Sequence, residues 1–294
     1  MDSNISNSSK IEDKSFAAKI TLQSKGKLFL LDEPKVMGIL NLTPDSFFEG
    51  SRVQLDADVL HLKVKQMVDD GVDIIDIGGY STRPGADEVT VEEECERTVW
   101  AVAFIKEKFP DHWISIDTFR AEVAKAAVHA GADIVNDISA GSLDPKMIEI
   151  VGRLGVPYIA MHMRGNPQTM QGLTQYEDIL KEMLVFFQEK YQQCIQAGIR
   201  DVILDPGFGF AKTLEQNYWI LKNLSYFKNI PIPILVGLSR KSMIYKKLGV
   251  SAEESLNGTT ALHMVSLING AQVLRVHDVL EAKQTIELYK QVYR

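Results

Sequence analysis

One pattern recurs along this chain and limits what it can fold into. A stretch with the apolar period of a helix ends near a glycine, a short run of apolar residues follows, and the run stops at a polar residue. Gly suits the position after a helix because it accepts a left-handed backbone. Continuous apolar runs are typical of parallel strands that are buried on both faces. The eight runs are residues 36–40, 72–77, 113–116, 134–135, 158–161, 202–204, 234–236 and 273–274.

Eight strand–helix units in about 260 residues predict an α/β fold, a single-domain (β/α)8 TIM barrel. A doubly wound open sheet is the alternative, because periodicity cannot show whether a sheet closes. Apolar alternation around Gly26 predicts a short β-hairpin at residues 17–31, ahead of the barrel. Residues 1–15 are rich in Ser and Asn without an apolar period, so we expect a disordered tail there and a barrel domain over residues 16–294.

The segments between these runs carry apolar stripes at helical spacing. Both cysteines fall on such stripes, so we interpret Cys95 and Cys194 as core residues rather than as reactive thiols. Asp278 and Glu281 have the spacing of a helix-starting cap. The stripes are Val91, Cys95, Val102 and Ile105, then Tyr176, Leu180, Phe187, Tyr191 and Cys194, and finally Val279, Ala282, Ile286, Tyr289 and Tyr293.

Composition and charge argue against several classes of function. With 39 acidic against 32 basic residues the net charge is −7, which argues against a basic nucleic-acid surface. No apolar run approaches the ~18 residues of a membrane helix, and the first residues lack a charged-then-apolar signal peptide. Two cysteines are too few for a disulfide framework or a zinc site. We therefore expect a cytoplasmic protein with no nucleic-acid or membrane partner.

Polar side chains follow every predicted strand. The carboxyl ends of barrel strands and the loops after them form the face that carries active sites. One Asp after a strand is usually a helix cap, but polar groups after all eight strands favour a binding face. Carboxylates, carboxamides, cations and imidazole together can read a polar heterocycle and hold an anion. These residues are Asn41, Ser81, Thr82, Arg83, Asp117, Asn136, His162, Asp205, Ser239, Arg240, Lys241, Arg275 and His277.

Eight short motifs in order make the chain similar to a known family. The segment MGILNLTPDSF at 37–47 and the segment DIGGYSTRPG at 76–85 resemble the two signatures of dihydropteroate synthases. Tyr80 stands where many members carry Glu or another residue. The match spans residues 36–280, nearly the whole chain. The other six motifs are SIDT at 115–118, VNDI at 135–138, MHM at 161–163, DPGFGF at 205–210, SRKS at 239–242 and RVHDV at 275–279.

The resemblance implies a transferase of folate biosynthesis. The family condenses (7,8-dihydropterin-6-yl)methyl diphosphate with 4-aminobenzoate to give 7,8-dihydropteroate and diphosphate. The resemblance also implies a Mg²⁺ cofactor, a sulfonamide target and a homodimer. No general base is evident, and an aromatic amine is a neutral nucleophile. We therefore favour a dissociative displacement in which the diphosphate leaves first.

The resemblance also assigns site residues, motif by motif. Those implied to bind the pterin are Asp117, Asn136, Met161, Asp205, Phe210, Lys241 and Arg275. Those implied for the diphosphate are Asn41, Thr82, Arg275 and His277, with Asn41 also binding Mg²⁺. Those implied for 4-aminobenzoate are Phe47, Thr82, Arg83, Pro84 and Ser242.

The loops after the first two strands are long. Segments 42–52 and 80–88 exceed the usual length of such connections and are rich in Pro, Ser, Thr and Gly. Loops of that length on the catalytic face can close over a reaction, and the resemblance implies that these do so and form the aminobenzoate pocket. His162, in the fifth loop, is expected to be structural.

Two other functions remain open from the sequence. Pterin-binding barrels include methyltransferases that pass a methyl group from a folate to a corrinoid, but those lack the STRPG segment found here at 81–85. A non-catalytic barrel that binds pterin for regulation would be expected to lose loop or phosphate residues first, and none is missing. Turnover of the diphosphate with 4-aminobenzoate separates all three.

Overall fold

Eight parallel strands form one sheet in the computed structural model, which describes residues 20–42, 56–80 and 89–293. The strands are β3 (Lys35–Asn41), β4 (Ile74–Gly78), β5 (Trp113–Asp117), β6 (Ile134–Asp137), β7 (Tyr158–Met161), β8 (Val202–Asp205), β9 (Leu235–Val236) and β10 (Val273–Val276). The helices are α2 (Ala57–Asp69), α3 (Val91–Lys108), α4 (Ala121–Ala130), α5 (Met147–Leu154), α6 (Ile179–Gln196), α7 (Leu214–Lys222), α8 (Ser242–Leu248), α9 (Leu256–Ile268) and α10 (Val279–Tyr293).

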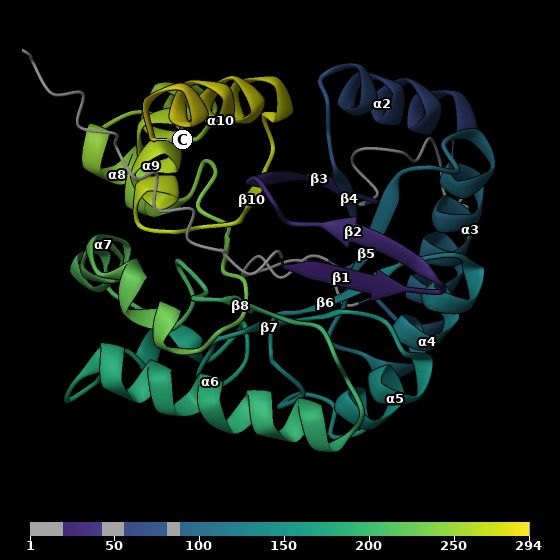
Figure 1. Cartoon of the computed structure of the whole chain (residues 1–294), viewed down its shortest axis with the longest axis horizontal. Helices are drawn as coiled ribbons and strands as arrows, with labels where there is room; N and C mark the ends of the chain where they lie inside the picture. Colours follow the sequence, from purple (N-terminus) through teal and green to yellow (C-terminus); the bar gives the residue numbers. More distant parts are fainter. Residues whose placement is uncertain (1–19, 43–55, 81–88, 294) are drawn as a thin grey trace, which may run out of the picture.

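The sheet closes into the predicted TIM barrel (Figure 1). Its strands pair in the order β8-β7-β6-β5-β4-β3-β10-β9, so the first and the last strand of the barrel are neighbours. The remaining junction is between β8 and β9. There Leu204 pairs in parallel with Ile234, and its N–H donates to the Pro233 carbonyl at 2.9 Å. This bridge argues against the open-sheet alternative.

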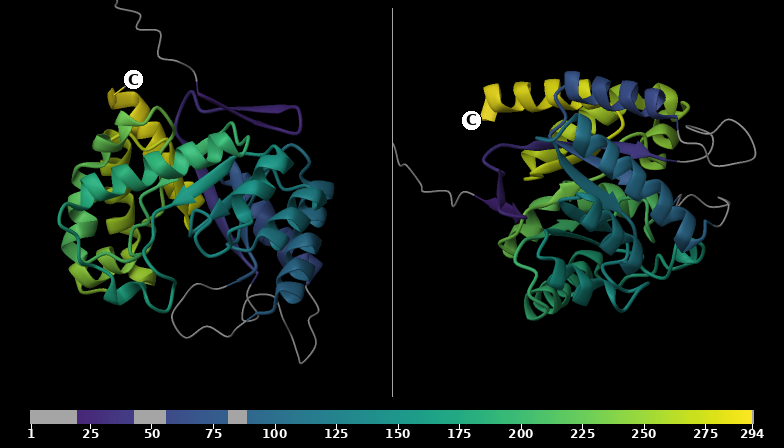
Figure 2. Two further views of the ribbon diagram at one scale, coloured as in Figure 1. Left: turned by 90° about the horizontal axis from the view of Figure 1, so that it is seen from below. Right: turned by 90° about the vertical axis from the view of Figure 1, so that its right-hand side faces the viewer.

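A hairpin of β1 (Thr21–Ser24) and β2 (Lys27–Leu30) precedes the barrel, as predicted. Leu22 packs in an apolar cluster with residues from the starts of the barrel strands, among them Ile74 and Trp113. Figure 2 shows the hairpin lying across one end of the barrel. The hairpin therefore covers the end that is opposite the carboxyl ends of the strands.

The helices surround the barrel, but the inner face of α3 differs from the predicted stripe. Its buried positions include Glu94 and Arg97, which are 0% and 4% exposed, whereas Cys95 is only partly buried. Glu94 pairs with Arg120 at 2.8 Å, and Arg97 donates to the Gly79 carbonyl at 3.2 Å. These partners are distant in sequence, so apolar spacing alone could not identify the buried face.

The apolar stripes predicted for α6 and α10 are buried over part of their length. Cys194 is buried in α6, as predicted. Tyr176 lies before that helix begins, and Tyr293 at the end of α10 is 55% exposed, so the buried faces of α6 and α10 are shorter than predicted. The carboxylate of Asp278, predicted as a cap, accepts two hydrogen bonds from Arg240, at 2.6 and 2.9 Å.

Some predictions fall outside the described residues, namely the tail at 1–15 and most of the two long loops. The strand predicted at 234–236 is reduced to the two residues of β9, where Pro233 removes a backbone donor just before the strand. Within the described ranges, no helix is both long and apolar enough to cross a bilayer.

Candidate active site

Neighbouring strands end at one level on the carboxyl side of the barrel. The register pairs Asn41 of β3 with Gly78 of β4. Asp117 of β5 pairs with Gly78 in turn, and Asn136 of β6 pairs with Asp117. A Cβ atom at Gly78 would lie 3.3 Å from Asn41 Oδ1 and 3.9 Å from Asp117 Cβ. Three of the predicted polar residues therefore share one rim, and the glycine leaves space between two of them.

Arg275 of β10 joins two carboxylates at this rim. Its Nε donates to Asp76 Oδ2 at 2.6 Å and its Nη2 to Asp117 Oδ2 at 2.5 Å. Burial raises the pKa of Asp117 to about 7, although the positive charge of Arg275 lowers it. Burial disfavours the charge of Arg275, but the two carboxylates more than offset this and raise its pKa. The guanidinium is thus held in place and stays charged.

Asp76 is a site residue that the sequence analysis missed. It is 0% exposed, and besides Arg275 it accepts a hydrogen bond from Asn136 Nδ2 at 3.2 Å. One carboxylate therefore holds two residues that are predicted to bind pterin. A signal was present, because an Asp flanked by apolar residues, as Asp76 is by Ile75 and Ile77, has to be paired if the strand is buried on both faces.

Asp205, at the end of β8, borders the same space from the other side. It is 6% exposed, and its Oδ1 accepts a hydrogen bond from the Gly207 N–H at 2.8 Å. Burial raises its pKa, while the positive charges of Lys241 and Arg275 lower it. A Cβ atom at Gly237 would lie 3.7 Å from Arg275 Cβ and 4.0 Å from Asp205 Oδ2. The small residue after β9 thus lets these two groups approach each other.

Lys241 reaches the site from the residue just before α8. Its Nζ donates to the Phe208 carbonyl and lies 4.9 Å from the centre of the Phe210 ring. Burial lowers its pKa to about 8, against the attraction of Asp205. The Lys241 ammonium, which is charged at neutral pH, therefore lies near the Asp205 carboxylate and the Phe210 ring. This arrangement suits a polar and flat ligand.

An apolar cluster flanks these polar groups. Met161 is 3% exposed at the end of β7, and Phe210 packs against the cluster from the loop after β8. Both are among the residues that the resemblance implies to bind the pterin. The other buried members of the cluster are Ile138, Met163, Met170 and Ala211.

The residues predicted for the anion lie nearby. His277 follows β10 and is exposed, and its Nδ1 lies 3.1 Å from Ser239 Oγ. Asn41 is exposed at the end of β3, which pairs with β10. Arg240, in contrast, is turned toward Asp278 rather than toward the barrel mouth. Ser242 is half-buried at the first position of α8.

His162 is buried away from solvent. It is 3% exposed, lies 4.9 Å from the Phe186 ring, and has a pKa well below its usual value because of burial. Its Nδ1 lies 3.1 Å from Nζ of Lys212, so the ring accepts there and stays neutral. These contacts agree with the structural role expected for His162. Lys212 itself was missed in the sequence.

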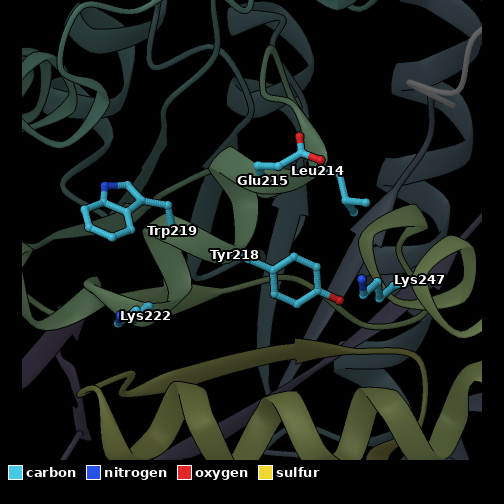
Figure 3. Close-up of a pocket in the computed structure, with 6 residues that line it drawn as sticks. All are labelled: Leu214, Glu215, Tyr218, Trp219, Lys222 and Lys247. Atoms are coloured by element: carbon cyan, nitrogen blue, oxygen red, sulfur yellow. The ribbon is translucent and has the colours of Figure 1, made fainter.

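The described residues also form a hollow of about 350 Å³ on the outside of the barrel, at α7 and α8. Figure 3 shows Tyr218 on the side of Lys247 and Trp219 on the other side of α7. None of the predicted site residues lines this hollow. Its lining residues are Leu214, Glu215, Tyr218, Trp219, Lys222 and Lys247.

The structure gathers Asp117, Asn136, Asp205, Lys241 and Arg275 at the barrel mouth. Five predicted site residues lie outside the described residues: Phe47, Ser81, Thr82, Arg83 and Pro84. Of the residues predicted to bind 4-aminobenzoate, Ser242 is therefore the one that belongs to the described residues. Within the described residues, no cluster of three or more His, Cys, Asp and Glu could hold a metal ion.

Comparisons with known proteins agree with this geometry. Residues 37–277 match the family model described as pterin binding enzyme. The chain is 44% identical to dihydropteroate synthase from Escherichia coli K12 over 275 residues, covering 92% of this chain and 95% of the relative. The Synechocystis dihydropteroate synthase is 45% identical over 262 residues, covering 88% of this chain and 90% of the relative.

Solved structures give the same result. The Yersinia pestis dihydropteroate synthase with a sulfonamide drug complex superposes with a TM-score of 0.85 at 39% identity, covering 93% of this chain and 98% of that one. The Xanthomonas albilineans dihydropteroate synthase with 4-aminobenzoic acid has a TM-score of 0.85 at 35% identity, with the same coverage. The matched family model, the relatives and the barrel-mouth geometry together show that this chain belongs to the dihydropteroate synthase family of pterin binding enzymes.

Proposed function

We propose that this barrel condenses (7,8-dihydropterin-6-yl)methyl diphosphate with 4-aminobenzoate, giving 7,8-dihydropteroate and diphosphate. One observation carries the proposal. The partly buried carboxylate of Asp117 and the buried carboxylate of Asp205 face one space. The cations Lys241 and Arg275 face the same space. Such a site can read the donors and acceptors of a heterocycle and also attract an anion.

The pterin edge presents N–H donors beside acceptors, and Asp205 suits the donors. Its Oδ1 already accepts from Gly207, so Oδ2, which faces Gly237, is the oxygen that we assign to the ring. Asn136 supplies a carboxamide that both donates and accepts. We assign the remaining ring nitrogens to Asp117 and the ring carbonyl side to Lys241.

Arg275 is suited to lie over the pterin ring. Its guanidinium is planar and is tied at two nitrogens, so little conformational entropy is lost when a ring stacks on it. Met161 and Phe210 supply the apolar surroundings that a flat ring requires. Arg275 also brings positive charge toward the diphosphate that we assign to Asn41 and His277.

We propose that Mg²⁺ binds with the diphosphate at Asn41. The ion takes oxygen ligands, keeps several waters and needs only one or two protein groups when a phosphate is present. An exposed carboxamide at the rim fits this requirement, and no acidic cluster in the described residues competes with it. When bound, the ion would neutralise charge on the leaving diphosphate. Asn41→Ala should raise the Mg²⁺ concentration that gives half-maximal activity, and an unchanged concentration would contradict this assignment.

The protein contributes positioning and electrostatics to the reaction. The C–O bond between the exocyclic methylene and the diphosphate breaks, and its electron pair leaves with the oxygen. The amine nitrogen of 4-aminobenzoate then bonds to the methylene carbon and releases a proton to solvent. Carboxylates around the ring, Asp117 and Asp205, favour the cationic intermediate. We assign Ser242 to the aminobenzoate side, next to Lys241.

The proposal is tested by measuring diphosphate release and dihydropteroate formation with both substrates. We expect equal amounts of the two products, and slow diphosphate release when 4-aminobenzoate is omitted. A protein that binds pterin but releases no diphosphate would be a non-catalytic barrel. Methyl transfer from a folate to a corrinoid, without diphosphate release, would support the methyltransferase alternative.

We also propose a homodimer that forms through the outer face of α7, α8 and α9. This face carries large apolar side chains that remain 46–53% exposed, among them Trp219, Leu248 and Ile268, and it includes the hollow in Figure 3. Exposed apolar groups on one face are typical of an association surface, and twofold symmetry is the common arrangement. Sedimentation should give a dimer mass that Trp219→Glu reduces. A monomeric wild type would contradict the proposal.

We propose a cytoplasmic location as well. Cys95 and Cys194 are free thiols on separate helices, and free thiols are typical of a reducing compartment. Cell fractionation with an antibody against the chain tests this location.

A further inference from the structure

The loop that follows β8 takes a strained path. Gly207, Gly209 and Ala211 have positive φ angles of 67°, 84° and 50°. An L-residue such as Ala211 adopts this conformation only at a cost. A Cβ atom at Gly207 would lie 2.3 Å from the His162 carbonyl oxygen, so the loop is pressed against the end of β7. Such a path persists only where surrounding contacts fix it.

One buried lysine supplies several of those contacts, beside Asn217, which accepts from the Gly209 N–H at 2.8 Å, and Tyr176, which donates to the Ala211 carbonyl at 3.0 Å. Lys212 is 6% exposed, and its Nζ donates to the carbonyl oxygens of Gly207 at 3.0 Å and Phe210 at 2.9 Å. It also donates to the His162 carbonyl at 3.2 Å and lies 3.1 Å from His162 Nδ1. The first two bonds close the loop on itself, and the other two tie it to the end of β7.

The loop held in this way carries several pterin-facing groups. The N–H of Gly207 donates to Asp205 Oδ1 at 2.8 Å, and the Phe208 carbonyl accepts from Lys241. The Phe210 ring lies 4.9 Å from the Lys241 ammonium. A shift of the loop would therefore move three groups together: the Gly207 N–H that bonds to Asp205, the Phe208 carbonyl that bonds to Lys241, and the Phe210 ring.

Packing alone does not account for a lysine at this position. Burial lowers the pKa of Lys212 to about 7, so the charged form is costly there, although Asp205 favours it. Lys241 and Arg164 oppose the charge further. The Lys212 ammonium bears this cost while its three N–H donors face four acceptor atoms, so the side chain contributes donors rather than volume.

We propose that Lys212 is a positioning residue of the pterin site. It fixes residues 206–211 so that Asp205, Phe210 and Lys241 present their groups to the ring, without contacting the substrate itself. This role rests on the proposed function, because it presupposes that the barrel mouth binds pterin.

The test compares pterin affinity with stability. Lys212→Met keeps the length of the side chain and removes every donor. We expect the Kd of pterin without a diphosphate group, measured by calorimetry, to rise at least ~10-fold, the equivalent of about 1.4 kcal/mol. The KM for 4-aminobenzoate should stay within about twofold of wild type, because none of the residues assigned to that substrate belongs to this loop. Lys212→Gln keeps one donor group and should fall in between.

Lys25→Met is the matched control. Lys25 is another lysine whose Nζ donates to two carbonyls, those of Val128 at 2.5 Å and Ala132 at 2.8 Å, but it is exposed and lies in the hairpin at the opposite end. We expect a lower melting temperature with an unchanged pterin Kd. An equal rise of Kd in both variants would mean that Lys212 only stabilises the fold.

A pterin Kd within about twofold of wild type in folded Lys212→Met would also overturn the proposal. If Lys212→Met does not fold, the pterin Kd of Lys212→Gln decides. A rise of threefold or more over wild type supports the proposal, and a smaller rise overturns it. Failure of the wild-type protein to bind pterin is a different result, because it would overturn the proposed function itself.

Discussion

Asp205 shows how a single side chain can decide the specificity of this site. Asp205→Asn keeps the size but replaces one acceptor oxygen with an NH₂ donor that would face the N–H groups of the pterin. Hydrogen bonds to a charged group are worth about 1.5–3 kcal/mol, so pterin affinity should fall at least ~10-fold. Calorimetric titration with the diphosphate substrate and with free pterin should give similar losses, since the damage is to the ring contact. Equal affinity in the mutant, with unchanged melting temperature, would mean that Asp205 only shapes the loop.

Asp76 makes a separate prediction, because it acts through its neighbours. Asp76→Asn should weaken pterin binding about tenfold. The neutral carboxamide no longer pairs with the charge of the Arg275 guanidinium, and its NH₂ group would face the donors of Arg275 or Asn136. Asp73→Asn is the control. Asp73 also accepts from a backbone N–H and from a lysine, at 2.8 and 2.9 Å, but at the other end of β4. The control should lose stability while pterin affinity is retained, and equal affinity losses would refute a specific role for Asp76.

The residues that sequence analysis missed share one property. Asp76 and Lys212 are buried charges that each bond to a residue distant in sequence, Arg275 and His162 respectively, so local spacing does not show what pairs with them. Glu94 and Arg97 were missed for the same reason. The strand-end residues were easier to find, because the carboxyl end of every barrel strand points toward one face and polar groups there stand out against apolar runs.

The elements themselves followed from the sequence more completely. The runs at 36–40, 113–116 and 158–161 lie within one residue of the observed strands, since a strand buried on both faces leaves a continuous apolar signal. Closure did not follow from that signal. It depends on the short bridge between Leu204 and Ile234, where the strand is only two residues long.

The hairpin gives the prediction that belongs to this scale. Leu22 is 1% exposed against the starts of the barrel strands, so Leu22→Ala should lower the free energy of unfolding by about 2–5 kcal/mol. Values of kcat and KM at 25 °C should stay within about twofold of wild type, because the hairpin covers the end away from the site. Leu28→Ala, at a position that is 68% exposed, should change stability by less than about 0.5 kcal/mol. Urea denaturation and steady-state kinetics measure both, and a large change in kcat would show that the two ends are coupled.

The whole molecule divides its functions between the two ends of the barrel. One end is sealed by the apolar cluster around Leu22, and the other carries the buried charges described above. The chain is acidic overall, at −7, yet Lys241 and Arg275 face the space assigned to an anionic substrate. Attraction of that substrate therefore depends on a few local cations rather than on net charge.

This arrangement predicts a narrow pH optimum for kcat/KM, which reports the free enzyme. Burial raises the pKa of Asp117 to about 7, and the carboxylate must be charged to accept from the ring, so activity should rise with pH up to about 7. Burial lowers the pKa of Lys241 to about 8, and loss of its charge above that pH should weaken substrate binding. Arg275 has a raised pKa and does not titrate in this range. Lys241→Arg should lower the maximum but remove the decline above pH 8, because Arg keeps its charge. A decline that persists unchanged in this variant would assign the basic limb to another group, first of all Lys212, whose pKa burial lowers to about 7.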